Sequence, residues 1–88
     1  MKVLLMTSDA YGSDGGIALY NRDLAEALVA LPKVTEVVVV PRNLAHQPGA
    51  VPANIRFVAR AAGGKARYIR TVIDIARDRF ELLICGHI

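Results

Sequence analysis

The chain of 88 residues contains one cysteine, two histidines and no tryptophan. Cys85 alone cannot form an internal disulfide, which fits a reducing compartment. One cysteine and two separated histidines also give no metal-ligand cluster, so no metal site is predicted. No apolar run approaches the roughly 18 residues that a membrane-spanning helix needs, because the opening run stops at Met6. The cytoplasm is therefore the expected compartment.

Aromatic side chains are also few, with three tyrosines and two phenylalanines. They do not interleave with the basic residues as a surface for stacking bases would require, so no nucleic-acid partner is predicted. What the chain does have is 53% hydrophobic and 22% charged residues, the composition of a globular chain with a packed core. Its length suffices for one small domain and excludes two independent cores.

Short apolar runs predict four β-strands. Residues 2–7, 36–41 and 81–85 are almost continuously apolar, as strands buried on both faces of a parallel sheet are. The second of these runs contains four consecutive valines, which favour a strand over a helix. Residues 55–59 predict a shorter strand.

Two helices are predicted between these strands. The first runs from Ile17 until Pro32 ends it, and the second follows Gly63 and Gly64. The expected core-facing side chains of the first helix are Ile17, Tyr20, Leu24, Ala27, Leu28 and Leu31, with Asn21, Arg22, Asp23 and Glu26 outside that stripe. Those of the second are Ile69, Val72, Ile73, Ala76 and Phe80, opposite Arg67, Arg70, Asp74, Arg77 and Asp78.

The order of elements predicts an α/β fold with a Rossmann-like parallel sheet of about four strands and two main helices. The chain stops just beyond the last strand, where a doubly wound domain would continue. We therefore expect residues 1–88 to be a truncated half of such a domain. If the last strand lay at the sheet edge, it would expose unpaired backbone and an apolar face, a liability for aggregation or dimerisation.

Ligands of open α/β sheets bind outside the carboxyl ends of the strands, which selects residues 8–16, 42–43 and 86–87. Gly15 and Gly16 stand where the first of these loops enters a helix. A phosphate or carboxylate could approach the backbone there and meet free N–H groups. The alternative is that the pair only forms a tight turn. Ser13 or Asp14 is the expected helix N-cap.

Two common nucleotide motifs are absent from this loop. It reads Gly12-Ser13-Asp14-Gly15-Gly16, which is not G-x-G-x-x-G, and the second strand ends in Pro41-Arg42 without the acidic residue of dinucleotide-binding folds. No Gly-Lys-Ser/Thr follows, so the loop is not a P-loop.

His87 is the candidate catalytic residue. It stands just after a strand, where a histidine can donate a hydrogen bond to a sugar hydroxyl or phosphate, or accept a proton. A structural or surface histidine fits the same position. His46, in a Pro/Gly-containing loop, is expected to have no functional role, and Cys85 is expected to be inert core.

Positive charge is concentrated in one part of the chain. Residues 54–80 carry seven basic side chains against two acidic ones, whereas residues 1–53 carry four against five. Arg67, Arg70 and Arg77 could contact a phosphate-rich partner or an anionic membrane surface. A solvated, arginine-rich helix face explains the same pattern.

Two segments resemble a known family. Residues 2–8, followed by residues 15–28 with the sequence GGIALYNRDLAEAL, are similar to the amino-terminal segment of the retaining, GT-B-type glycosyltransferases of group 1. Residues 80–88, FELLICGHI, resemble that family's fourth strand and the histidine after it. The likeness covers most of the chain in order, and the two matches together carry it.

The resemblance implies a two-domain enzyme that moves a sugar from a nucleotide-sugar donor to a sugar or lipid-linked acceptor, with no cofactor and no obligatory metal. Gly15 and Gly16 would lie beside the donor phosphates and the acceptor, and His87 would face the transferred sugar. The family's paired glutamates and main donor contacts belong to a carboxy-terminal domain absent from these residues. We therefore expect an acceptor-side fragment, cytoplasmic or peripheral to the membrane, that is not competent alone.

A second hypothesis needs no transferase. The chain could be a stand-alone Rossmann-like module that binds a small anion or nucleotide at Gly15 and Gly16, or that mediates an interaction.

Overall fold

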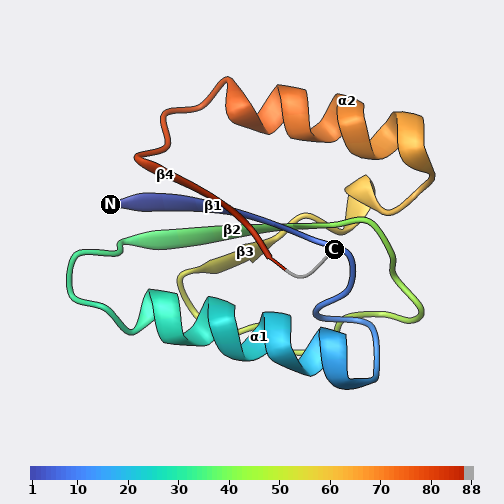
Figure 1. Ribbon diagram of the computed structural model, residues 1–88, viewed down its shortest axis with the longest axis horizontal. Helices are drawn as coiled ribbons and strands as arrows, with labels where there is room; N and C mark the ends of the chain where they lie inside the picture. The colour runs from blue at the N-terminus through green and yellow to red at the C-terminus, as the bar shows by residue number, and fades with distance from the viewer. Residues whose placement is uncertain (87–88) are drawn as a thin grey trace.

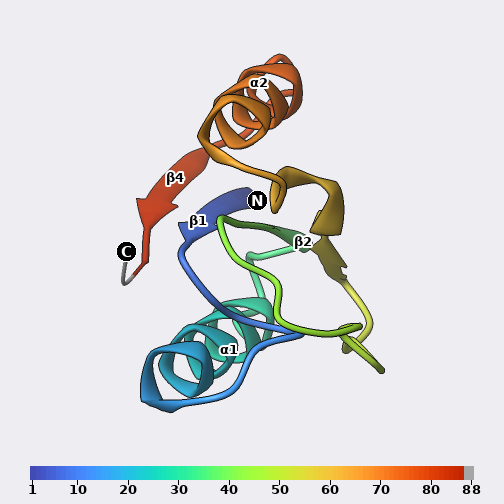
Figure 2. The same cartoon turned by 90° about the vertical axis from the view of Figure 1, so that its right-hand side faces the viewer.

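A computed structural model describes residues 1–86 and contains a parallel four-stranded sheet with helices on both faces (Figure 1). The strands are β1 (Lys2–Thr7), β2 (Glu36–Pro41), β3 (Ile55–Phe57) and β4 (Leu82–Cys85), in the spatial order β3-β2-β1-β4. Helix α1 (Gly16–Val29) covers one face, while α2 (Lys65–Ala76) and the short 3-10 helix η1 (Ala59–Ala61) cover the other (Figure 2). The predicted Rossmann-like α/β fold is confirmed.

The two central strands form the core, because successive side chains of a strand point to opposite faces. Val3, Leu5, Val37 and Val39 lie in the hydrophobic cluster on the α1 face. Their neighbours Leu4, Val38 and Val40 lie in a second cluster with Ile75 of α2. All seven strand side chains are fully buried, which explains why β1 and β2 read as continuous apolar runs.

Helix α1 packs through small and polar side chains, so the predicted apolar stripe is partly wrong. Its buried residues are Ala18, Asn21 and Ala25, and Leu24 and Leu28 are half-buried beside them. Ile17 and Tyr20, expected in the core, are exposed. The short side chains let the helix backbone lie close to the sheet, an advantage that hydrophobicity alone does not reveal.

Helix α2 is rotated from the predicted orientation. Thr71 and Ile75 are its buried residues, with Tyr68 and Val72 half-buried, whereas Ile69 and Ile73 are exposed. The prediction of a core face through Ile69 and Ile73 is wrong, because the contact with β1 and β2 is made by the neighbouring side of the helix.

Two predictions at the sheet edges are also wrong in detail. β4 lies at the edge and pairs only with β1, so Cys85 is exposed rather than buried in the core. β3 is shorter than predicted, because the chain leaves the sheet after Phe57 and turns into η1 at Ala59.

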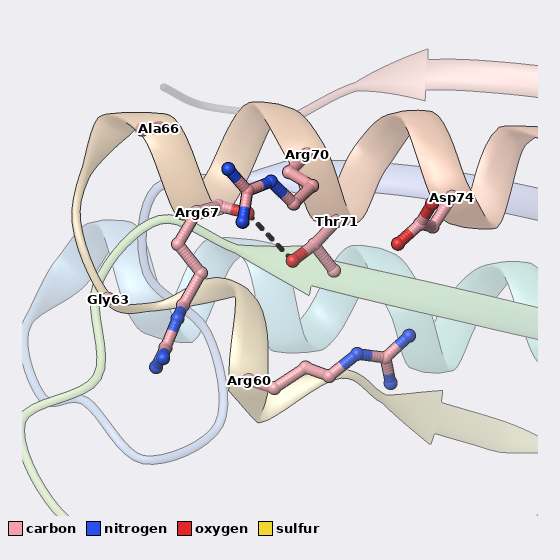
Figure 3. A pocket seen from close by; sticks show the side chains of 7 residues that line it. All are labelled: Arg60, Gly63, Ala66, Arg67, Arg70, Thr71 and Asp74. Atoms are coloured by element: carbon pink, nitrogen blue, oxygen red, sulfur yellow. Dashed lines mark hydrogen bonds between the residues drawn. The ribbon is translucent and has the colours of Figure 1, made fainter.

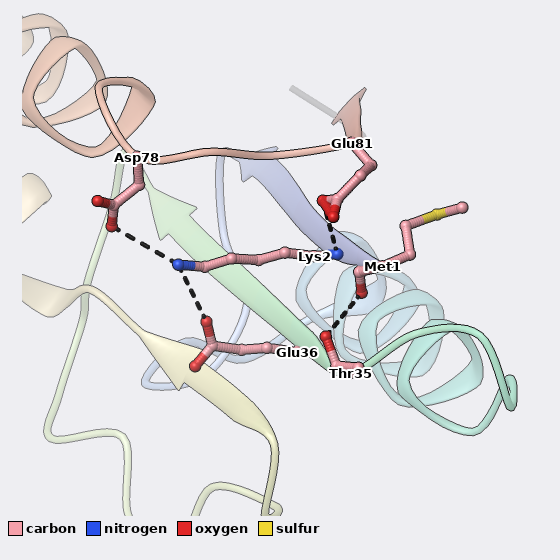
Figure 4. A network of polar contacts seen from close by, with 6 residues as sticks. All are labelled: Met1, Lys2, Thr35, Glu36, Asp78 and Glu81. Carbon is pink, nitrogen blue, oxygen red and sulfur yellow. Dashed lines mark hydrogen bonds and ion pairs between the residues drawn. The ribbon is translucent and has the colours of Figure 1, made fainter.

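Lys2 joins three elements at the amino end of the sheet (Figure 4). Its backbone N–H donates to Glu81 Oε2 at 3.0 Å, and its carbonyl accepts from Glu81 N at 3.0 Å. Its ammonium lies 3.6 Å from carboxylate oxygens of both Glu36 and Asp78, and 5.0 Å from the ring centroid of Phe80. The segment before β4 is therefore fixed to β1 by hydrogen bonds, and the Lys2 ammonium also pairs with Glu36 of β2 and Asp78.

A pair of matched substitutions tests the strand order. Leu5→Ala should lower the free energy of unfolding by about 2–5 kcal/mol, because Leu5 is fully buried and the change leaves a cavity. Leu83→Ala on edge strand β4, where the side chain is 59% exposed, should change it by about 0.5 kcal/mol or less. Urea denaturation measures both, and equal losses would contradict a central β1 and a peripheral β4.

Candidate functional site

The loops that follow β1 and β2 are bonded to one another at the carboxyl edge of the sheet. In the first loop (residues 8–15), the carbonyl of Ser8 accepts from Asn43 N at 2.8 Å and Arg42 N at 3.1 Å. The carbonyl of Gly12 accepts from Ala45 N and His46 N, both at 2.9 Å. Two of the three stretches selected from the sequence, residues 8–16 and 42–43, are thus brought together.

Two polar side chains of helix α1 donate hydrogen bonds to backbone carbonyls of the first loop. Asn21, fully buried, donates from Nδ2 to the carbonyl of Asp9 at 2.7 Å. Arg22 donates from Nη1 to the carbonyls of Ala10 and Ser13 at 3.1 and 2.8 Å. The loop backbone is therefore fixed by the same helix whose amino terminus it leads into.

Tyr11 anchors the loop in the core. Its ring is buried and packs edge-on against Phe57 with centroids 5.6 Å apart, and its hydroxyl donates to Glu26 Oε2 at 2.8 Å. Burial, and then the bond to the Glu26 carboxylate, raise the pKa of Tyr11. The phenol of Tyr11 therefore stays protonated, and the side chain serves to fix the loop to the core.

No side chain within residues 1–86 caps the amino terminus of α1. Gly15 is the N-cap, with φ 100°, and the first turn contains no acidic residue. The prediction that Ser13 or Asp14 caps the helix is wrong, because the left-handed conformation at Gly15 turns the chain before their side chains reach the first N–H groups. A Cβ on Gly15 or Gly16 would meet no atom within 4 Å, so both glycines border open space.

Two buried hydroxyls belong to β1 and to the loop that leads into α1. Thr7 Oγ1, at the end of β1, and Ser13 Oγ, in the first loop, have no hydrogen-bond partner within residues 1–86. A buried hydroxyl without a partner costs roughly 1–3 kcal/mol. A ligand group or water that reached either one would remove that cost.

The end of β4 meets the same site. Gly86 N donates to Met6 O at 2.8 Å, and a Cβ on Gly86 would lie 2.8 Å from Asn21 Oδ1 and 3.4 Å from Thr7 Cγ2. Only a glycine fits this approach without displacing the Asn21 amide. The predicted catalytic residue, His87, lies outside the described residues, and its role stays a prediction from the sequence.

His46 lies closer to this edge than its sequence context suggested. Its Nε2 is 3.5 Å from Asp14 Oδ2 of the first loop, and its Nδ1 is 2.9 Å from the carbonyl of Gln47. The pKa of His46 is raised, first by the Gln47 carbonyl and then by the Asp14 carboxylate. The two residues lie in different loops and meet only in the folded chain. The residues around His46 in the sequence therefore do not predict this ion pair.

Arg42 reaches a different part of the edge. With Lys65, Tyr68 and Ile69 it lines a hollow of about 360 Å³ beside the first turn of α2. The Tyr68 hydroxyl is buried without a partner inside the described part of the chain, and burial raises its pKa. Arg42, after β2, and Lys65, at the start of α2, therefore place positive charge beside this hollow.

Sequence reasoning missed Asn21 and Arg22. Both lie outside the predicted apolar stripe and were given no role, yet they fix the loop. The spacing Ala18, Asn21, Ala25 carries a usable signal, since small residues three and four apart mark the side of a helix that lies close to a sheet. No group of three or more His, Cys, Asp or Glu side chains forms a metal site between residues 1 and 86.

In comparisons with known proteins, no family model, no curated protein and no solved structure matches the chain. The function is therefore argued from the residues and the geometry of this edge.

Asn21→Ala tests the support of the loop. It removes the part-buried hydrogen bond from the fully buried Asn21 amide to the Asp9 carbonyl, so the free energy of unfolding should fall by about 1–3 kcal/mol. Asp23→Ala, on the exposed side of the same helix, should change it by about 0.5 kcal/mol or less. Denaturant unfolding measures both, and a neutral Asn21→Ala would show that the loop does not depend on this side chain.

The His46–Asp14 pair predicts a pH dependence. Because the pKa of His46 is raised in the folded chain, its protonation stabilises the fold fully below the ordinary value of 6.5. That contribution is lost as the pH rises through the raised pKa. NMR titration of the ring protons should give a value above 6.5, and Asp14→Asn should lower it only in part, because the Gln47 carbonyl remains. A wild-type value at or below 6.5 would contradict this.

Proposed function

We propose that the chain is an acceptor-side, Rossmann-like part of a glycosyltransferase that moves a sugar from a nucleotide-sugar donor. In this proposal the carboxyl edge of the sheet holds the phosphate-bearing end of a substrate at the amino terminus of α1. The observation that carries it is the uncapped, glycine-bordered start of α1, at the end of the loop that follows β1.

Anion binding is the first step of the argument. The first turn of a helix presents N–H groups without intrahelical partners and carries a partial positive charge. Within residues 1–86, no side chain caps these groups at α1, and the first turn contains no carboxylate. Gly15 and Gly16 have no side chains, and the space that a Cβ would occupy is open. A phosphate can therefore approach the backbone directly.

The chemistry of sugar transfer fits the rest of the edge. Thr7 and Ser13 have buried hydroxyls without hydrogen-bond partners among residues 1–86, and a hydroxyl of this kind can bond a sugar or phosphate that reaches it. The resemblance of residues 2–8, 15–28 and 80–88 to the group 1 enzymes supplies the reaction class. Transfer also needs contacts that stabilise the leaving diphosphate, which that resemblance assigns to a carboxy-terminal domain. This chain would then contribute binding and positioning, and not transfer by itself.

A small-anion or nucleotide-binding module is the second candidate, and the same uncapped helix start favours it. The two candidates differ in what they bind. A sugar-transfer domain should prefer sugar phosphates or nucleotide sugars, whereas a plain anion site should bind pyrophosphate equally well.

An NMR titration separates these outcomes. The ¹⁵N-labelled chain is titrated with three probes that carry no transferable sugar: pyrophosphate, uridine diphosphate and guanosine diphosphate. It is also titrated with glucose 1-phosphate and with the glucose and mannose esters of the two nucleoside diphosphates. The amides of Gly15, Gly16 and Ile17 should shift first. Stronger binding of the sugar-bearing probes supports the transferase, and equal binding supports the anion module. Unchanged amides at millimolar ligand would overturn both.

Gly16→Asp provides a variant in which binding and stability change in opposite directions. A carboxylate in the first turn should stabilise α1 by about 0.3–1 kcal/mol and should repel an incoming phosphate. Binding should weaken by about tenfold, with no loss in the thermal unfolding temperature. Ala27→Asp, which adds the same charge to an exposed position late in α1, should bind as the wild type does.

A further inference from the structure

The outer side of α2 carries an apolar row. Ile69 and Ile73, one helical turn apart, are 49% and 53% exposed, and Ala66 and Ala76 beside them are exposed as well. The contacts with the sheet side of the molecule are made by Thr71 and Ile75 on the other side of the helix. Single exposed apolar residues are ordinary, but here they form a continuous row on a helix of 12 residues.

Basic side chains border this row. At about 100° per residue, Arg70 and Arg77 follow one side of it and Lys65 lies on the other. Asp74 is the only acidic residue of α2, and its carboxylate lies 3.9 Å from Arg77. The outer side of α2 therefore combines an apolar centre with net positive margins.

A basic hollow adjoins one margin (Figure 3). It measures about 530 Å³ and is lined by Arg60 of η1, by Arg67, Arg70 and Thr71 of α2, and by Asp74 at one end. No carboxylate between residues 1 and 86 lies within ion-pair distance of Arg60, Arg67 or Arg70. These guanidinium groups are available to phosphate oxygens, which they can bind in pairs of hydrogen bonds.

We propose that α2 lies in the headgroup layer of an anionic lipid bilayer. The apolar row of Ile69 and Ile73 enters the upper acyl region, Arg70 and Arg77 contact lipid phosphates, and the hollow accepts a further phosphate at Arg67. An apolar centre with cationic margins is the pattern of helices that lie in a membrane surface. No helix within residues 1–86 is long and apolar enough to cross a membrane.

The isoleucine row decides between a lipid surface and another polyanion. Nucleic acid or a purely acidic peptide such as polyglutamate would neutralise the arginines but would leave Ile69 and Ile73 in water. A bilayer satisfies both the charge and the apolar area. The inference is independent of what binds at the start of α1, so it goes beyond the proposed transfer function.

Vesicle flotation tests this surface, because aggregated protein sinks and only lipid-bound protein rises. The purified chain should float with phosphatidylcholine vesicles that contain phosphatidylglycerol, and not with phosphatidylcholine alone. Binding should fall as salt is added. Arg70→Glu with Arg77→Glu should lower the partition coefficient by at least about tenfold, since each basic residue near an anionic surface contributes about fivefold. Ile69→Ser with Ile73→Ser should lower it by a similar factor.

Matched double variants serve as controls. Lys33→Glu with Arg56→Glu gives the same net charge as the arginine reversal. These two residues lie away from α2, in the connection between α1 and β2 and in β3. Leu19→Ser with Leu31→Ser removes two leucines that are 52% and 53% exposed on or just after α1. Both controls should float as the wild type does, and Arg70→Lys with Arg77→Lys should keep most of the binding.

Several results would overturn the proposal. A chain that is folded by circular dichroism and does not float with the anionic vesicles excludes it. Equal losses in the control variants would mean that net charge or general hydrophobicity drives binding. Unchanged flotation of the isoleucine variant would exclude insertion. Binding to heparin or polyglutamate through the arginines, without binding to vesicles, would identify an acidic macromolecule as the partner instead.

Discussion

The pairing of β1 with strands on both of its sides is the constraint on which the rest of the molecule depends. β1 is hydrogen-bonded to β2 along one side and to β4 along the other, and its apolar side chains enter the cores on both faces. Its end therefore determines where the first loop begins, where α1 starts, and where Gly86 arrives. The candidate site is a set of chain ends brought together by one buried strand.

The strands could be predicted from the sequence because burial on both faces leaves a continuous apolar run, as in residues 36–41. The buried faces of the two helices could not be predicted in this way. Which side of each helix contacts the sheet depends on how closely the helix backbone lies to it, and not on hydrophobicity alone. Asn21 is polar yet fully buried, while Ile69 and Ile73 are apolar yet exposed. An interface of short side chains brings the α1 backbone closer to the sheet than one of leucines would, and the pattern of large apolar residues does not report that distance.

The candidate site was predictable in its location and not in its construction. Gly15 and Gly16 could be selected because the rule for open α/β sheets needs only the order of the strands. The supports of the loop could not be selected, since Arg22 and Asn21 act on carbonyls nine to twelve residues away. The absence of a cap was also unpredictable, because it depends on the left-handed backbone at Gly15 and not on whether Ser13 or Asp14 is a suitable capping residue.

Asn21 has a consequence for communication across the carboxyl edge. Its amide nitrogen bonds the first loop at Asp9, and its amide oxygen faces the space where a side chain at Gly86 would lie. A ligand that displaced the first loop would rotate this amide or break its bond, and either change would alter the space beside Gly86. The same side chain thus lies against both the first loop and the end of β4.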